Sequence, residues 1–298
     1  MTTIPAKIVP IVYNTDKWIE ENKQYFLPPV CNKLMHSDGQ MKVFYVGGPN
    51  QRKDYHIEEG EELFYMLKGD MCLKVIEHGK HRDVVIKEGE IFLLPGKIAH
   101  SPQRHENTIG LVIEREREKT ELDGLRYYQT VDGEPTTDSL YEEWFYCTDL
   151  GTELGPVIKR YFESEQHKTG KSIPGTIPEN PPIILDSKTS LQDPFNLHKW
   201  IEDHREEIDS KGFVQLFGDN NQFSVKVYGK GENTDQCDKA ETWIWQIEGR
   251  SEVSVDGSLY KLETNDSMLV PTGLRYTATR QEGSISLICY QDPTRKKS

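Results

Sequence analysis

Short apolar runs separated by turn-forming residues dominate the chain. In the first half, Met71–Ile76 and Val84–Ile86 are two such runs, and Gly79 lies in a plausible hairpin turn between them. In the second half, Asp256-Gly257 separates two more short runs, which is a strong hairpin signal. Many short strands at this spacing are typical of a sandwich or barrel, with the jelly roll among the candidates. We therefore expect a mainly β fold with a few short helices.

Three segments of the first half recur in the second half. Their offsets all lie near ~180 residues, a near-constancy that unrelated matches would not produce. We infer two copies of one domain, related by duplication, with small deletions in the hairpin turns. The matched pairs are Lys17–Glu20 with Lys199–Glu202, Phe64–Gly69 with Ile244–Gly249, and Gly89–Pro95 with Asn265–Pro271.

The stretch between the copies has the composition of a linker. Residues 163–182 are rich in Pro, Gly and polar side chains, with clusters at Ser172–Gly175 and Pro178–Pro182, as expected of an ordered or semi-extended connection. The predicted organisation is therefore an N-terminal domain over residues 1–162, this linker, and a C-terminal domain over residues 183–298.

Composition and charge narrow the range of possible partners and cellular compartments. The 298 residues include 35% hydrophobic and 29% charged side chains, as in a soluble globular protein. No run approaches the ~20 apolar residues of a membrane helix. The N-terminus lacks the basic start and apolar core of a secretory signal, so we expect a cytosolic protein. The net charge of -13 argues against nucleic acid or an anionic membrane as a partner.

The cysteines give no indication of a site. They are odd in number, scattered and never arranged as a C-x-x-C pair, which argues against a disulfide framework or a thiolate metal site. We expect reduced thiols at all of these positions, which are Cys31, Cys72, Cys147, Cys237 and Cys289.

Two histidines and one glutamate in the first copy are candidate metal ligands. His56 and Glu62 lie close in sequence, and His100 lies further along. Two imidazoles and one carboxylate form the facial set that leaves positions free on a ferrous ion, as oxygenase chemistry requires. Such a trio is a weak signal alone, because surface His and Glu are common.

The spacing around these residues resembles the cupin motifs. Those motifs read G-x5-H-x-H-x3-4-E-x6-G and, further on, G-x5-P-x-G-x2-H-x3-N. The resemblance implies two cupin-type jelly-roll β-barrels in one chain, the first of which carries the ligands. The matching residues are Gly48, His56, Glu62 and Gly69 for the first motif, and Gly89, Pro95 and His100 for the second.

Two departures from the cupin pattern matter. Asp54 replaces the first histidine, which converts a four-ligand pattern into the three ligands His56, Glu62 and His100. Arg104 replaces the final asparagine and places a cation four residues past a ligand.

One ligand is ambiguous within the motif. Glu61 satisfies the spacing from His56, whereas Glu62 satisfies the spacing to Gly69. We prefer Glu62, because it opens the apolar strand Glu62–Leu67. The residue spacing along a strand to its terminal glycine varies less than the spacing across the turn before the strand.

Longer stretches resemble one particular cupin family. Val46–His56, Glu61–Tyr65 and Pro95–Arg104, with Pro28–Lys33 near the start, look like the 3-hydroxyanthranilate 3,4-dioxygenase family. The resemblance covers nearly the whole chain, including the second, degenerate barrel. Because no C-x-x-C pair lies near the C-terminus, the chain resembles the animal two-barrel form. Bacterial members have a single barrel and often carry an extra cysteine-ligated iron.

The resemblance implies a ring-opening reaction. It implies one Fe(II) per chain, with O2 as co-substrate and 3-hydroxyanthranilate bound to the iron through its hydroxyl and amino groups. The ring would open between C3 and C4 to give 2-amino-3-carboxymuconate semialdehyde. That product cyclises without an enzyme to quinolinate, in the kynurenine route from tryptophan to NAD.

The resemblance also implies roles for individual residues. Arg104 would pair with the substrate carboxylate. Arg52 would lie on the oxygen side and stabilise a developing anion. Glu114 and, more weakly, Asn32 match substrate-binding positions of the family, and Glu62 would contact the substrate as well as hold the iron.

Each charged candidate also has a simpler interpretation. Arg104 could be a surface arginine, and Arg52 could belong to a solvated loop. Glu114 heads the charge run Glu114–Glu118, which alone is typical of a solvated face.

The second copy lacks the ligand set. When the copies are aligned, Tyr276 takes the position of His100, and Gln236 falls close to that of His56. A phenol is a poor ligand for Fe(II) at neutral pH, so we expect no metal in the C-terminal barrel. We also expect a monomer, since the second barrel can cover an edge and a pocket mouth that dimerisation covers in single-barrel relatives.

Two other classes of protein fit parts of the pattern. A metal-free or storage-type bicupin would keep the barrels and the duplication without needing the trio or the arginines. A cupin enzyme of another class, such as a sugar isomerase or a thiol dioxygenase, would keep a metal. Metal identity and an aerobic assay on 3-hydroxyanthranilate discriminate among the three.

Overall fold

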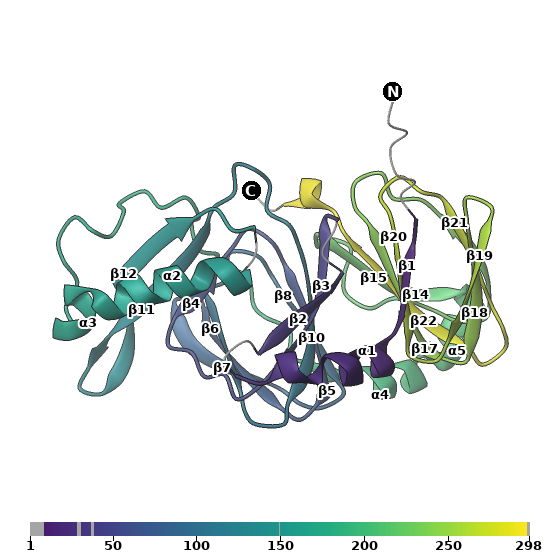
Figure 1. The fold of residues 1–298 in the computed structure, drawn as a ribbon, viewed down its shortest axis with the longest axis horizontal. Coiled ribbons are helices and arrows are strands. Elements are labelled where there is room, and N and C mark those ends of the chain that lie inside the picture. The colour runs from purple at the N-terminus through teal and green to yellow at the C-terminus, as the bar shows by residue number, and fades with distance from the viewer. Residues whose placement is uncertain (1–8, 29–30, 37–38, 149, 297–298) are drawn as a thin grey trace. The chain divides into compact units, whose positions relative to one another are not determined.

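The chain divides into two compact units, each built around its own barrel (Figure 1). The computed structural model describes residues 9–28, 31–36, 39–148 and 150–296. Of these, the unit called here the first barrel comprises residues 24–28, 31–35, 43–148 and 150–197, and the unit called the second barrel comprises residues 9–23, 36, 39–42 and 198–296.

Two six-stranded sheets build the first barrel. The first sheet consists, in spatial order, of β13 (Phe195–Asn196), β8 (Glu90–Leu94), β5 (Glu62–Lys68), β10 (Ile109–Arg115), β3 (Met41–Gly47) and β2 (Asn32–His36). The second consists of β12 (Glu134–Phe145), β11 (Asp123–Val131), β4 (Tyr55–Ile57), β9 (His100–Arg104), β6 (Met71–Glu77) and β7 (Lys80–Ile86).

The core of the first barrel lies between these two sheets. Phe64 and Met66 of β5 meet Leu73 and Val75 of β6 in one apolar cluster, and none of the four is more than 2% exposed. Full burial of such a side chain stabilises the fold by about 1.5–3 kcal/mol. Polar side chains at other inward-facing positions of these strands are therefore held in a rigid frame inside the barrel.

Helix α2 (Leu150–Glu163) covers the hairpin of β11 and β12, as Figure 1 shows. Val157 and Tyr161 of the helix pack against Leu125 and Tyr127 of β11 in a second apolar cluster. The rings of Tyr127 and Tyr161 are stacked, with centroids 3.4 Å apart. The helix is thereby fixed over one side of the barrel interior.

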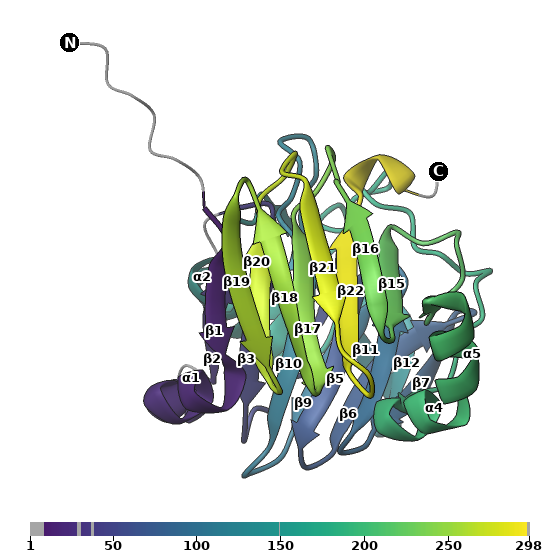
Figure 2. The same cartoon turned by 90° about the vertical axis from the view of Figure 1, so that its right-hand side faces the viewer.

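The second barrel also has two sheets, one of which faces the viewer in Figure 2. That sheet consists of β16 (Gly231–Asp235), β21 (Tyr276–Arg280), β18 (Arg250–Val255) and β19 (Ser258–Glu263). The other consists of β1 (Ile11–Asn14), β20 (Asp266–Val270), β17 (Thr242–Glu248), β22 (Ile285–Gln291), β15 (Phe223–Tyr228) and β14 (Phe213–Gln215). Apolar side chains from both sheets form one cluster between them.

The duplicated elements adopt matching structures. Gly69 directly follows β5 and Gly249 directly follows β17, and both take the left-handed conformation, with φ of 66° and 68°. His100 and Tyr276 each open the corresponding strand, β9 or β21. The expectation of a mainly β chain with two barrels is confirmed.

Each unit is assembled from segments that are separated in sequence. Residues 11–14 form β1, which pairs with β20 and so joins the second barrel. The segment that follows the predicted linker stays with the first barrel, because β13 pairs with β8 and the Leu191 N–H donates to Glu77 Oε1 at 2.7 Å. Both pairings are distant in sequence.

The helices are short and few. Within the described ranges, none has the length and apolar character that crossing a bilayer requires. All five cysteines are free thiols, as their spacing predicted. Besides α2, the helical segments are α1 (Thr15–Asn22), η1 (Lys23–Phe26), α3 (Glu165–Thr169), α4 (Leu197–Asp203), α5 (Arg205–Lys211) and η2 (Pro293–Arg295).

Candidate metal centre

His56, Glu62 and His100 converge inside the first barrel. The strands β4 and β9 pair so that His56 lies directly opposite His100, and their ring centroids are 5.3 Å apart. Glu62 is the first residue of β5 on the facing sheet. One donor atom from each residue lies within 4.8 Å of the others, and all three side chains are buried. The group contains Glu62 and not Glu61.

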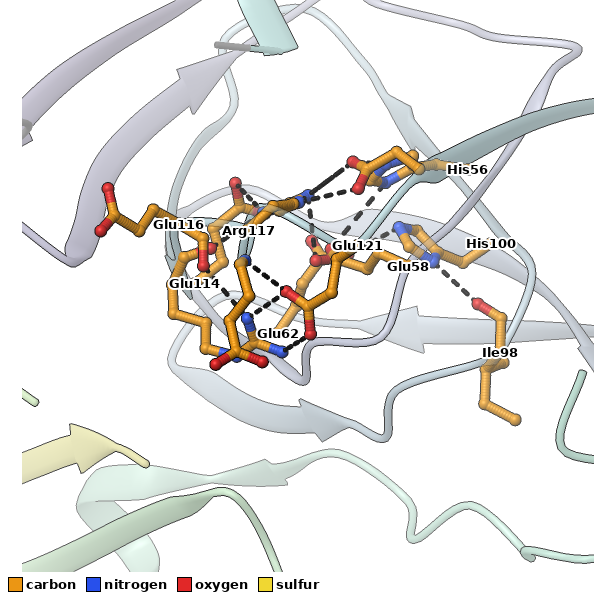
Figure 3. A network of polar contacts seen from close by, with 12 residues as sticks. His56, Glu58, Glu62, Ile98, His100, Glu114, Glu116, Arg117 and Glu121 are labelled. Carbon is orange, nitrogen blue, oxygen red and sulfur yellow. Dashed lines mark hydrogen bonds and ion pairs between the residues drawn. The ribbon is translucent and has the colours of Figure 1, made fainter. Parts of the chain in front are cut away.

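His100 and Glu62 point an imidazole nitrogen and a carboxylate oxygen at one another. His100 Nδ1 donates a hydrogen bond to the Ile98 carbonyl at 3.0 Å, so Nε2 carries the lone pair of the neutral ring. That Nε2 lies 2.7 Å from Glu62 Oε1 (Figure 3). Burial opposes charge on both groups, but their mutual attraction raises the pKa of His100 and lowers that of Glu62. Two acceptors this close require a shared proton or a metal ion.

The donor set fits a divalent transition metal. Two imidazoles and one carboxylate are the ligands that leave open positions on such an ion. A neighbouring group of three carboxylates, Glu58, Glu62 and Glu114, is also close enough to hold an ion. Arg117 already forms ion pairs with Glu58 and Glu114, so that second group is supplied with a cation by the protein itself.

A buried aspartate holds the other histidine. His56 Nε2 donates to Asp123 Oδ2 at 2.7 Å. Asp123 is 1% exposed, and burial would raise its pKa, but Arg117 and His56 together hold that pKa at about 2. Burial lowers the pKa of His56, so the ring stays neutral at pH 7. A neutral imidazole with one nitrogen fixed by a carboxylate is the usual state of a metal-binding histidine.

The charge run that begins at Glu114 is buried, and its simpler interpretation as a solvated face is wrong at three positions. Glu114, Arg115 and Arg117 are 5%, 1% and 7% exposed. Arg115 binds Glu121 through two hydrogen bonds of 2.7 Å. Burial and the neighbouring Glu62 raise the pKa of Glu114 to about 7 against the opposing effect of Arg117. Figure 3 shows Glu114 and Glu58 on either side of Arg117, with Glu116 pointing away.

A cavity of about 270 Å³ opens beside the three candidate ligands. Its lining combines polar and apolar residues, and α2 contributes Leu154, Gly155 and Ile158. Arg52, Arg104 and Asn32 line it together with the three candidate ligands, whereas the Glu114 carboxylate lies next to Glu62 and against Arg117. The lining residues are Cys31, Asn32, Phe44, Val46, Asn50, Arg52, His56, Glu62, Phe64, His100, Pro102, Arg104, Val112, Leu154, Gly155 and Ile158.

Arg104 brings an unneutralised positive charge to the cavity wall. It is 5% exposed, and its Nε has no hydrogen-bond partner. In the part of the chain that the structure describes, it forms no ion pair. Burial, reinforced by the neighbouring Arg52, lowers the pKa of Arg104 to about 10, which still leaves it charged at pH 7. A buried guanidinium of this kind can form a bidentate pair with a carboxylate.

Arg52 is held on the same cavity by two neighbours. Its Nε donates to Asp54 Oδ2 at 2.9 Å, and its Nη2 binds the same oxygen. The side-chain amide of Gln103 accepts from the Arg52 N–H at 3.1 Å and donates to the Arg52 carbonyl at 2.8 Å. Asp54, which replaces a ligand of the cupin motif, therefore anchors an arginine and lies outside the ligand group.

Sequence reasoning missed the residues behind the ligands. Asp123, Arg117 and Glu58 belong to no motif, and Asp123 lies 67 residues from the histidine that it binds. The one available signal was the alternation of acidic and basic residues from Glu114 to Lys119, which is compatible with a network of ion pairs. The apolar cavity wall from α2 was missed as well, because only the tertiary fold brings that helix to the barrel.

Known proteins share both the sequence and the fold. Residues 8–162 match the sequence model of the 3-hydroxyanthranilic acid dioxygenase family. The 3-hydroxyanthranilate 3,4-dioxygenase of Xenopus tropicalis is 54% identical over 95% of this chain and 99% of its own. The enzyme of the same name from Bos taurus is 53% identical over 94% of this chain and 96% of its own.

A solved structure supports the fold alone. A cupin 2 conserved barrel domain protein from Leptotrichia buccalis is 10% identical and has a TM-score of 0.52 over 96% of this chain and 98% of its own. Fold and site together define a two-barrel cupin protein with a candidate metal centre. The chain belongs to the 3-hydroxyanthranilic acid dioxygenase family.

Proposed function

We propose that the protein is an Fe(II)-dependent dioxygenase that opens the ring of 3-hydroxyanthranilate with O2. The product would be 2-amino-3-carboxymuconate semialdehyde, the precursor of quinolinate in the kynurenine pathway to NAD. One observation carries the proposal: three convergent ligands, His56, Glu62 and His100, share a cavity with the unpaired guanidinium of Arg104. A metal and a carboxylate receptor on one cavity suit a substrate that is both a chelator and a carboxylate.

The polar and apolar residues that line the cavity suit the polar groups and the ring of this substrate. The carboxylate would pair with Arg104, whose buried charge has no partner among the described residues. The flat ring would lie against the apolar wall of Val112, Leu154 and Ile158. The hydroxyl and amino groups would then be directed toward the ligand group, with Glu62 and Glu114 as nearby acceptors and Asn32 on the cavity wall.

His56, Glu62 and His100 would hold the ferrous ion. When bound, that ion supplies the redox-active centre at which the ring and O2 react. The protein's own part is to bind, orient and compensate charge. Arg52 presents a guanidinium to the same cavity, and Asp54 fixes its direction, so Arg52 would stabilise negative charge that develops as oxygen reacts.

We further propose one active site per chain. The ligands would all come from the predicted N-terminal range 1–162, and the C-terminal range 183–298 would hold no iron. Tyr276 lies at the position of His100, and burial raises the pKa of its phenol far above neutrality, which disfavours a phenolate ligand. We expect this chain to act as a monomer in the cytosol.

The test is an aerobic assay with purified protein, Fe(II) and 3-hydroxyanthranilate. We expect loss of the substrate absorbance and growth of a transient product band near the visible edge, with one O2 consumed per substrate. The same mixture without oxygen, and the His100→Ala variant with oxygen, are the controls and should be silent. Turnover of another cupin substrate with none of 3-hydroxyanthranilate would overturn the proposal.

A further inference from the structure

Arg117 and Asp123 form a buried pair behind the candidate metal centre. Arg117 follows the end of β10, and Asp123 is the first residue of β11. Arg117 Nε donates to Asp123 Oδ1 at 2.9 Å, and Arg117 Nη2 donates to Oδ2 at 2.9 Å. Both side chains are buried, at 7% and 1% exposure. This fork geometry fixes the plane of the carboxylate.

The same carboxylate orients one of the candidate ligands. Strand β11 pairs with β4 so that Leu125 lies opposite His56, which brings Asp123 beside the imidazole. His56 Nε2 donates to Asp123 Oδ2 at 2.7 Å, so Nδ1 keeps the lone pair of the neutral ring. Asp123 thereby decides which ring nitrogen is free to bind a metal and which way the ring faces.

Arg117 also reaches the acids on the other side of the site. Its Nη1 lies 3.1 Å from Glu114 Oε1, and its Nη2 lies 2.9 Å from Glu58 Oε2. A donor oxygen of Glu114 and one of Glu58 each lie within 4.8 Å of Glu62. One planar guanidinium therefore contacts an acid that holds a ligand histidine and two acids that adjoin the ligand glutamate (Figure 3). A lysine carries its three donors on one nitrogen and has no such fork, so it could not grip the Asp123 carboxylate through two parallel bonds while reaching both glutamates.

We propose that Arg117 is a positioning residue that couples metal retention to substrate recognition. Through Asp123 it fixes the ring of His56. It also holds Glu114, an acid that would lie near the bound substrate. Only the part of the proposal that concerns substrate recognition rests on the proposed function. The part that concerns metal retention follows from the contacts of Arg117 with Asp123 and of Asp123 with His56. Arg117 itself touches neither the metal ligands nor the cavity; it acts through the acids that it holds.

A matched pair of variants separates this role from simple core stability. Arg115 is also buried and binds Glu121 through two 2.7 Å hydrogen bonds. Arg117→Lys and Arg115→Lys should therefore destabilise the fold to a similar degree. Asp123→Asn removes the charge beside His56 with almost no change in shape, and it keeps the experiment decisive where a lysine variant does not fold.

The decisive readout is metal affinity, measured for each folded variant by competition of Fe(II) with a chelator. Asp123→Asn and Arg117→Lys should weaken Fe(II) binding by roughly 10- to 100-fold, the usual effect of removing a partner of a ligand histidine. Arg115→Lys should stay within about 3-fold of the unmodified protein. The absorption spectrum of the Co(II)-substituted protein should change in the first two variants and not in the third.

A kinetic split tests the substrate half. With the iron site saturated, Arg117→Lys should raise KM for 3-hydroxyanthranilate several-fold, because Glu114 loses its anchor, whereas Asp123→Asn should leave KM nearly unchanged. Equal Fe(II) affinity in the Arg117 and Arg115 variants, with an unchanged Co(II) spectrum in Asp123→Asn, would overturn the proposal. If the unmodified protein opened no ring while the affinity losses were still seen, the proposed function would fail and the positioning role would stand.

Discussion

The carboxylate of Asp54 accepts a hydrogen bond from Arg52 Nε at 2.9 Å, at the sequence position where four-ligand cupins have their first histidine. Asp54 is 3% exposed. It does not belong to the ligand group and does not line the cavity. A single replacement therefore removes one metal ligand and anchors a cation on the cavity wall. In the proposed enzyme, this replacement would open a position for oxygen and place a positive charge beside it.

Arg52→Ala is expected to lower kcat more than it affects substrate binding. The cation would act on charge that develops during the reaction, so its loss should cost on the order of 100-fold in kcat with KM within a few-fold. Steady-state kinetics at saturating oxygen and iron would measure this. Asp54→Asn, which leaves Arg52 without its anchor, should show a smaller loss of the same kind. Iron content should be normal in both, and a pure KM effect would contradict the assignment.

Arg104→Ala is expected to weaken substrate binding. The variant removes a charge-assisted pair from a desolvated wall, at a cost of about 2–4 kcal/mol, which corresponds to roughly 30- to 700-fold in affinity. Anaerobic titration of the iron-loaded protein with 3-hydroxyanthranilate would give the Kd directly. Arg104→Lys should recover part of the loss, since a point charge replaces the fork. If both variants bound substrate as well as the unmodified protein, Arg104 would not face the carboxylate.

Far from the cavity, Glu77 should make stability depend on pH. Its carboxylate accepts hydrogen bonds from Arg82 Nη1 at 2.8 Å and from the Leu191 N–H at 2.7 Å. Partial burial opposes ionisation, but these bonds hold the pKa of Glu77 below its usual value. A lowered pKa stabilises the fold above the unfolded value of about 4.3, and the gain is lost as the pH falls through the folded value.

Glu77→Gln should therefore cost about 1–2 kcal/mol of unfolding free energy near neutral pH and progressively less below about pH 4. Urea unfolding of both proteins from pH 3 to pH 7 would measure the difference. Lys74→Gln, which removes an exposed ion pair with Asp83 on the same hairpin, is a suitable control with a small effect throughout. A cost for Glu77→Gln that did not change with pH would exclude the ionised carboxylate as its cause.

The candidate site divides into a part that its sequence pattern predicts and a part that only the fold supplies. His56, Glu62 and His100 follow from motif spacing, because strand pairing across a barrel makes that spacing nearly fixed. Asp123 and Arg117 do not, because they meet His56 only through the pairing of β11 with β4. A charged stretch at a strand end has the same composition whether it is solvated or buried, so composition could not distinguish the two.

The same limit applies to the fold. Alternating apolar residues predict the strands, because this alternation is a local property of the sequence. The duplicated segments then predict two β-barrels. The assignment of β1 to the second barrel depends on its pairing with β20, more than 250 residues away, where Val12 lies opposite Met268. No local pattern encodes such a partner. The placement of α2 over the cavity depends in the same way on the stacking of Tyr161 on Tyr127.

The central claim is that His56, Glu62 and His100 hold one catalytic iron. The most direct measurement is the iron content per chain of the Fe(II)-loaded protein and of a His56→Ala, His100→Ala double variant, with a chelator-treated sample assayed alongside. We predict one tightly bound iron in the unmodified protein, none in the folded double variant, and activity that is lost with the chelator and restored by Fe(II). Two tightly bound irons per chain, or iron retained in full by the double variant, would contradict the account.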